Sequence, residues 1–163
     1  MKYRRLTIEE LEELQPEFTT FLATHGIPAE DWVKMKGENP ERCERLIEMF
    51  SDIVFDKILA GVEFLEHREA KIIRIFKFEK SKVIMNGLKI DGETSIDFRK
   101  DQNSEQMNQL FRLSSGKLNI FTAQKEYKQD RSLEIFRLMQ SGARILKEDR
   151  LFRTIEELKN QNQ

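Results

Sequence analysis

A histidine beside carboxylates is the most reactive-looking group in this chain. His67 lies in the tetrapeptide Glu66-His67-Arg68-Glu69, and a neighbouring carboxylate can hold an imidazole in the tautomer that a general base needs. On a β-strand, however, His67 points away from the face that carries Glu66 and Arg68, because successive side chains alternate. Glu66 and His67 therefore form a candidate polar site, and a histidine that is hydrogen-bonded locally at a strand end is the alternative.

Three carboxylates, Glu48, Asp52 and Asp56, are spaced four residues apart and would suit a hard cation such as magnesium. At ~100° per residue of a helix, all three lie roughly opposite Phe50, the middle of an apolar stripe. They therefore face outward. We expect a solvated acidic row, with Arg45 pairing with Glu48, in preference to a metal site.

Basic and aromatic residues are interleaved over 74–82. Arg74, Lys77 and Phe78 are the candidate nucleic-acid contacts, because proteins that bind single-stranded RNA stack bases on aromatic side chains beside cationic groups. The same aromatic residues are equally what a sheet presents to packed helices. The net charge of −1 for the whole chain leaves phosphate contacts to a local patch, so nucleic-acid binding is a third hypothesis.

Other catalytic signatures are missing from the sequence. It has no nucleophile elbow, no paired-histidine zinc motif, no Gly-rich dinucleotide turn and no complete phosphate loop. One cysteine and two histidines are too few for the usual tetrahedral zinc sites, and Cys43 lies on an apolar stripe where burial is expected. We therefore expect a non-catalytic interaction or regulatory module with no metal and no cofactor. An enzyme of unrecognised type, using His67 with carboxylates, is the alternative.

Hydrophobic periodicity changes from helical to β-like and back to helical along the chain. A capping box at Thr7 and Glu10 begins a helix, which Pro16 interrupts near residue 15. Another helix start follows at Pro28. The longest apolar stripe at the helical period predicts a helix over 40–60.

Short runs rich in Ile, Val and Phe predict antiparallel strands over 62–67, 72–79, 83–90 and 94–99. A two-residue hairpin at Asp91-Gly92 would join the last two, and a bulge is expected at Asn86-Gly87. One more strand is expected over 117–123, and helices over 104–113, 130–140 and 149–159. The sequence thus predicts a single α+β domain over residues 1–163. Its N-terminal and C-terminal helices pack on a central, mainly antiparallel sheet of about four or five strands.

The C-terminal half of the long helix is apolar nearly all round. Phe55 and Leu59 project on the side of the outward carboxylates, roughly opposite Phe50. Either the N-terminal helix packs across them, or they form a self-complementary patch in a two-fold dimer. Phe55 and Leu59 are therefore the candidate interface, and the partner is a second copy or an unknown protein.

Several short strings are spread over the whole chain, among them Met1-Lys2-Tyr3-Arg4, Phe50-Ser51-Asp52, Leu65-Glu66-His67 and Ser141-Gly142. Through them the chain resembles a small uncharacterised bacterial family, a domain of unknown function. The resemblance implies a cytoplasmic bacterial protein and supplies no activity, cofactor or functional residue. A cytoplasmic location also fits the single cysteine, and no stretch reaches the ~20 apolar residues of a membrane helix, so no membrane partner is expected.

Overall fold

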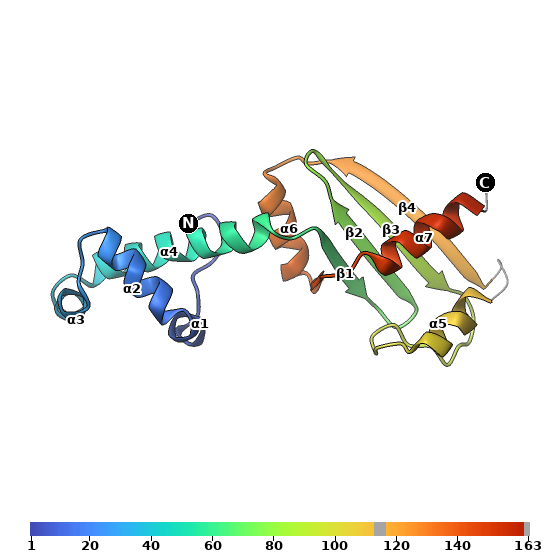
Figure 1. Ribbon diagram of the computed structural model, residues 1–163, viewed down its shortest axis with the longest axis horizontal. Helices are drawn as coiled ribbons and strands as arrows, with labels where there is room; N and C mark the ends of the chain where they lie inside the picture. Colours follow the sequence, from blue (N-terminus) through green and yellow to red (C-terminus); the bar gives the residue numbers. More distant parts are fainter. Residues whose placement is uncertain (113–116, 162–163) are drawn as a thin grey trace. The chain divides into compact units, whose positions relative to one another are not determined.

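The computed structural model describes residues 1–112 and 117–161 (Figure 1). The chain forms two compact units, Met1–Ala60 and Gly61–Gln163. Helices make up the first unit, and the second combines helices with a five-stranded antiparallel sheet. This confirms the predicted α+β class, whereas the organisation of residues 1–163 as one domain stays a prediction.

The first unit contains four helices, α1 (Ile8–Glu13), α2 (Gln15–Thr24), α3 (Ala29–Glu38) and α4 (Pro40–Ala60). The capping box is confirmed, because the Thr7 side chain accepts from the Glu10 amide and the Glu10 side chain accepts from the Thr7 amide. Pro16 lies in the first turn of α2, where its missing amide costs no hydrogen bond. Local signals thus set the helix boundaries here.

Aromatic side chains build the core of the first unit. The Phe18 ring lies 5.0 Å from the Phe50 ring and 5.2 Å from the Trp32 ring, which joins α2, α3 and α4. The buried members of this cluster are Leu6, Phe21, Leu22, Ile27, Trp32, Cys43, Leu46 and Phe50. Cys43 is therefore part of the core, as the apolar stripe predicted.

The second unit is built on a sheet of β1 (Phe64–Arg68), β2 (Ile72–Phe78), β3 (Lys82–Ile90), β4 (Leu118–Glu126) and β5 (Arg144–Leu146). The strand order is β4-β3-β2-β1-β5, and every neighbouring pair is antiparallel. β4 confirms the strand expected over 117–123. The three-residue β5 was not predicted, since so short a strand has no period of its own.

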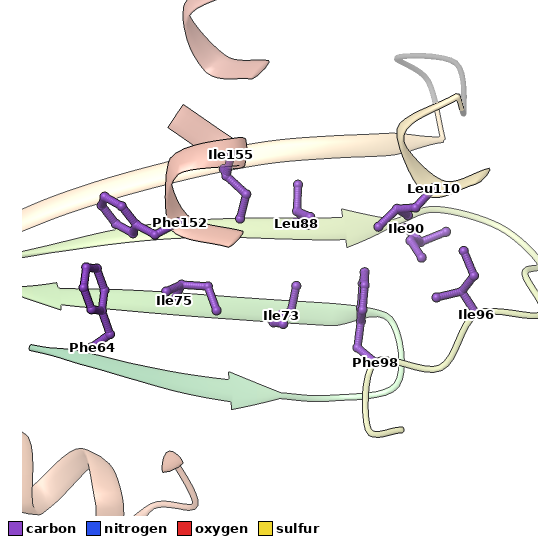
Figure 2. Packing of buried hydrophobic residues seen from close by; sticks show 10 residues of the cluster. All are labelled: Phe64, Ile73, Ile75, Leu88, Ile90, Ile96, Phe98, Leu110, Phe152 and Ile155. Carbon is purple, nitrogen blue, oxygen red and sulfur yellow. The ribbon is translucent and has the colours of Figure 1, made fainter. Parts of the chain in front are cut away.

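Helices lie on both faces of this sheet. α5 (Ser104–Phe111) and α7 (Arg150–Gln161) pack on one face, where Leu110, Phe152 and Ile155 meet the apolar side chains of β1, β2 and β3 (Figure 2). α6 (Arg131–Gln140) lies on the other face, beside Phe76 and Phe78. The C-terminal helices therefore pack on the sheet as predicted. Residue 113, the last of the helix expected over 104–113, lies outside the described residues.

The prediction of a strand over 94–99, joined by a hairpin at Asp91-Gly92, is wrong. Residues 94–99 form an irregular segment, and β3 pairs with β4 instead, with Ile90 opposite Leu118. This segment folds over the end of the sheet and buries the side chains of Ile96 and Phe98 (Figure 2). Their alternation with polar residues therefore reflects burial and not strand pairing. The Phe98 amide donates to the Ala70 carbonyl at 3.0 Å, which ties the segment to the β1–β2 turn.

The prediction of a bulge at Asn86-Gly87 is also wrong. Both residues keep an unbroken register, with Gly87 opposite Arg74 on β2 and opposite Phe121 on β4. Gly87 serves a different purpose, because the Phe121 ring lies where a Cβ at this position would stand. Close approach of a ring, and not a change of register, explains this glycine.

Candidate ligand-binding site

The site begins with a buried carboxylate on the sheet. Glu66 is only 7% exposed and lies on the same face of β1 as Phe64. Its Oε2 accepts from Nη2 of Arg68 at 3.0 Å, and its Oε1 accepts from Nη2 of Arg144, directly opposite on β5, at 3.1 Å. Because a buried charge is tolerated only when it is paired, these arginines keep Glu66 within the fold.

Arg68 links β1 to the irregular segment that follows β3. It lies on the same strand face as Glu66, and its Nη1 donates to the Phe98 carbonyl at 3.1 Å. Its Nε–H is buried and has no hydrogen-bond partner within residues 1–112 and 117–161. The guanidinium is thus fixed by two contacts and keeps one buried donor unused.

Gln102 ends this irregular segment and places a buried acceptor at the same site. Its Nε2 donates to the carbonyls of Asp97 at 2.5 Å and Lys100 at 2.7 Å. A carbonyl can only accept, so these contacts fix the orientation of the side-chain amide. The remaining atom, Oε1 of Gln102, is buried and has no partner in the described part of the chain.

The segment that carries Gln102 is held by a local ion pair. Arg99 Nη2 lies 2.8 Å from Oδ2 of Asp97, and the Arg99 amide donates to Oδ1 at 3.0 Å. The side-chain hydrogen bond from Arg99 is the main cause that lowers the Asp97 pKa from 3.8 to about 2. This carboxylate therefore stays ionised at any ordinary pH.

Arg68 and Gln102 both line a cavity of about 600 Å³, within the size range of small-ligand sites. It lies between β1, β5, α5, the segment before α5, and α7. Its polar lining consists of Glu66, Arg68, Asp101, Gln102, Asn103, Asn108, Glu148, Arg150 and Thr154. Its apolar lining consists of Ile73, Phe98, Met107, Phe111, Leu146 and Leu151. A cavity of this mixed composition can bind and orient a small molecule.

The same lining offers little for covalent or acid–base chemistry. Among its described residues there is no histidine, cysteine or lysine, and the Glu66 carboxylate is already held by two arginines. Thr154, the only hydroxyl there among the described residues, donates to the Arg150 carbonyl at 2.9 Å. Within residues 1–112 and 117–161 no group of three or more His, Cys, Asp or Glu side chains could hold a metal ion.

The structure does not bring the predicted pair Glu66 and His67 together. His67 lies on the opposite face of β1, as strand alternation indicated. Its Nε2 lies 3.5 Å from the place where a Cβ on Gly142 would stand, at the end of α6. Glu66 belongs to the cavity, whereas His67 does not.

The three candidate nucleic-acid contacts are not gathered on one surface either. Phe78 is only 5% exposed, so its ring is not available to stack a base. Lys77 lies on the face opposite to that of Arg74 and Phe78, with Nζ 5.8 Å from the Phe152 ring. Nη1 of Arg74 forms an ion pair with Oε2 of Glu69 at 2.8 Å. The three residues therefore do not form the basic and aromatic patch that the sequence suggested.

The candidate interface residues are at least partly covered within one chain. The Phe55 ring lies 4.9 Å from the Arg4 guanidinium and 5.7 Å from the Tyr3 ring. Leu59 is 1% exposed. The N-terminal segment before α1 thus contacts Phe55, which also packs, like Leu11 of α1, against the core of the first unit. Self-association through Phe55 and Leu59 stays a prediction.

The acidic row on α4 keeps solvent access at Glu48 and Asp56, whose side chains are 35% and 51% exposed, but its partners differ from the expected Arg45. Asp52 accepts from the backbone amides of Lys2 at 2.8 Å and Tyr3 at 3.1 Å. Asp56 accepts from the Tyr3 hydroxyl at 2.6 Å, and Glu48 accepts from the guanidinium of Arg5 at 2.8 Å. The three carboxylates therefore anchor the N-terminal segment, a pairing that sequence spacing alone could not indicate.

Sequence reasoning missed three of the polar residues that define the site, Arg68, Gln102 and Arg144. Arg68 carried a usable signal, because alternation on β1 places it and Glu66 together on the face that becomes apolar on β2. No sequence signal pointed to Gln102 or Arg144. Gln102 belongs to an irregular segment, and Arg144 meets Glu66 across 78 residues of chain.

A five-stranded antiparallel sheet with helices on its faces thus defines an α+β protein, and a cavity of about 600 Å³ lies between the sheet, α5 and α7. The chain belongs to DUF6495, a family of unknown function whose model matches residues 1–160. This confirms the resemblance to a domain of unknown function. Neither the curated proteins nor the solved structures gave a match. Among the described residues, no helix has both the length and the apolar character needed to cross a membrane.

Proposed function

We propose that this protein is a non-catalytic binding module that takes a small molecule into the cavity between β1, α5 and α7. The observation that carries the proposal is one cavity of about 600 Å³ that combines polar side chains, among them Arg68 and Gln102, with apolar ones. Its volume is within the size range of small-ligand sites. Its apolar side chains supply affinity for an apolar part of a ligand.

The rest of the site supports binding without catalysis. Glu66 accepts from Nη2 of Arg68 and from Nη2 of Arg144, and the Phe98 carbonyl accepts from Nη1 of Arg68. Such fixed polar groups give orientation and specificity. The enzyme alternative requires His67, which lies on the other face of β1, so the geometry favours a binding module that reports on or responds to a small molecule.

We also propose that the protein works in the cytoplasm of a bacterium. Cys43 is a free, buried cysteine, and unpaired thiols are typical of a reducing compartment. The bacterial source rests on the family resemblance described above.

The proposed function can be tested by two-dimensional NMR of the full chain with four single-ring probes at millimolar concentration: benzamide, acetophenone, benzoate and benzylamine. We expect at least one probe to shift amide signals of cavity residues. Asn108→Trp places bulk at the exposed rim of the cavity on α5 and should abolish the shifts. Gln109→Trp is the matched control, because Gln109 is also exposed on α5 but does not line the cavity.

Two outcomes would contradict the proposal. One is that none of the four probes shifts signals of the cavity residues in the wild type. The other is that Asn108→Trp leaves the shifts intact, which would mean that binding occurs elsewhere.

A further inference from the structure

We infer that the outer edge of β4 is a self-association surface, on which β4 of a second copy pairs in antiparallel orientation and joins the two sheets into one. β4 is the outermost strand on its side of the sheet, and no strand of the described chain pairs with its outer edge (Figure 1). None of its residues lines the cavity, so this inference goes beyond the proposed function and does not rest on it.

The hydrogen bonds between β3 and β4 show which backbone groups of β4 face outward. In an antiparallel pair, residues that bond to the partner strand alternate with residues that face away from it. The Asp91 amide donates to the Lys117 carbonyl at one end of the pair, and the Tyr127 amide donates to the Ser81 carbonyl at the other. The register between them is unbroken. The odd-numbered residues of β4 therefore bond to β3, and the amides and carbonyls of the even-numbered ones, 118 to 126, point outward.

β4 lacks the features that protect a free edge strand. Such strands are usually short, or they carry a charge, a proline or a bulge that prevents pairing with another chain. β4 is nine residues long and has no bulge, and residues 118–124 contain no charged residue and no proline. The strand at the opposite edge, β5, is three residues long and carries Arg144. The sheet thus has one protected edge and one edge that is open to pairing.

The middle of β4 is accessible to another strand. Thr122, Ala123 and Gln124 are all exposed, so the helices on the two faces of the sheet leave this part of the strand uncovered. Affinity at a sheet edge comes mainly from backbone hydrogen bonds, and large apolar side chains are not required. The small and polar side chains of this stretch are therefore compatible with an interface.

The charges of β4 favour a second copy in antiparallel orientation. Lys125 and Glu126, its only charged residues, both lie at the C-terminal end. When two copies overlap fully, Lys125 of one lies opposite Asn119 of the other, whose side chain bonds to the Asp91 carboxylate. The uncharged middles then meet, with Thr122 opposite its own copy. An in-register parallel pair would instead place each charge beside its like, which is destabilising.

Two substitutions of one exposed residue test this surface. Light scattering of the full chain, from micromolar to submillimolar concentration, should give the wild type twice the mass of one chain. Gln124→Pro removes an outward amide and no bond to β3, since proline is tolerated on the free side of an edge strand. We expect this variant to be a folded monomer.

Gln124→Ala is the matched control. It loses the same side chain, including the 3.5 Å contact between Gln124 Oε1 and Lys82 Nζ, but it keeps the backbone amide. We therefore expect Gln124→Ala to remain a dimer. Circular dichroism and NMR spectra report whether each variant is folded.

Amide hydrogen exchange of the wild type gives a second measurement that needs no variant. The outward amides of Ile120, Thr122 and Gln124 are bonded only in the dimer, so their exchange should be at least about tenfold slower in a concentrated sample than in a dilute one. The amides of Phe121 and Ala123 bond to β3 in both states and are the internal reference.

Three results would overturn the inference. A wild type that stays monomeric at submillimolar concentration would exclude pairing with a second copy and leave this edge to an extended segment of another protein. A dimer that persists in folded Gln124→Pro would place self-association elsewhere on the chain. If that variant does not fold, exchange decides, and rapid exchange of the three outward amides in the wild-type dimer would contradict pairing at β4.

Discussion

The ring of Phe121 on β4 lies over the backbone of Gly87 on β3. A Cβ at Gly87 would stand 2.1 Å from Cζ of the ring, far inside van der Waals contact. Gly87 and Phe121 are directly opposite in the β3–β4 register, and the Arg74 guanidinium lies 5.7 Å from the same ring. The glycine thus provides the space in which the Phe121 ring, carried by the edge strand β4, covers the neighbouring strand β3.

Replacing Gly87 should therefore be costly through Phe121. We expect Gly87→Ala to lower the free energy of unfolding by about 1–3 kcal/mol, the scale of overpacking. In a double-mutant cycle with Phe121→Ala, the loss at Gly87 should be much smaller, because the clashing ring is gone. Urea denaturation of the four proteins measures this coupling, and strictly additive losses would show that the ring does not restrict Gly87.

The ion pairs of Glu66 should differ in strength. We expect Glu66→Ala to cost about 3 kcal/mol, because it leaves the largely buried Arg68 charge without its partner. Arg144→Ala should cost less than about 1 kcal/mol, since the Arg144 side chain is 66% exposed and Arg68 still holds Glu66. Denaturation midpoints of the two variants compare them directly. Glu66→Ala removes both ion pairs and Arg144→Ala only one, so equal losses would mean that the Arg68 pair contributes nothing.

Glu10 should make the free energy of unfolding of the first unit depend on pH in the acid range. Its pKa is lowered from 4.5 to about 2, chiefly by the side-chain hydrogen bond from Arg4 and next by the backbone amide of Thr7. Because the folded pKa is depressed, this component is present above pH 4.5 and is lost as the pH falls toward 2. NMR titration of the Glu10 carboxyl group measures the pKa.

The Arg4→Ala variant is the control for Glu10. We expect the Glu10 pKa to rise in this variant but to stay below 4.5, because the Thr7 amide still donates to the carboxylate. An unchanged pKa in Arg4→Ala would show that the guanidinium is not the main cause.

Cys43 should behave as a buried side chain and not as a reactive thiol. It is 5% exposed within the core of the first unit. We expect slow reaction with a disulfide reagent in the native protein and fast reaction once denaturant is added. Rapid labelling of the folded chain would instead indicate a thiol activated by nearby arginines.

Local sequence signals predicted the helices well. The capping box at Thr7 and Glu10, the proline at the start of α2 and the glycines after α2 and α6 act within a few residues of the boundary they set. Gly26 and Gly142 both have positive φ, 73° and 110°, as a helix-ending glycine requires. Such features can be read from a single chain because their energetics are local.

Long-range pairing was predicted less well. Alternation of Ile96 and Phe98 with polar residues is the pattern of a strand, yet it arises here from a segment that folds over the end of the sheet. The cavity depends on similar non-local contacts, since Arg68 meets the Phe98 carbonyl across 30 residues. Strand periodicity placed Glu66 and His67 on opposite faces, but it could not show what each face would meet.

The location of a bound probe tests the binding cavity most directly. In the complex of the full chain with benzamide, intermolecular nuclear Overhauser effects from the ring protons report which side chains lie within about 5 Å. We expect them to reach the methyl groups of Met107, Leu146 and Leu151, which line the cavity from α5, β5 and α7. Effects confined to side chains outside this cavity, or none at saturating benzamide, would contradict a ligand site there.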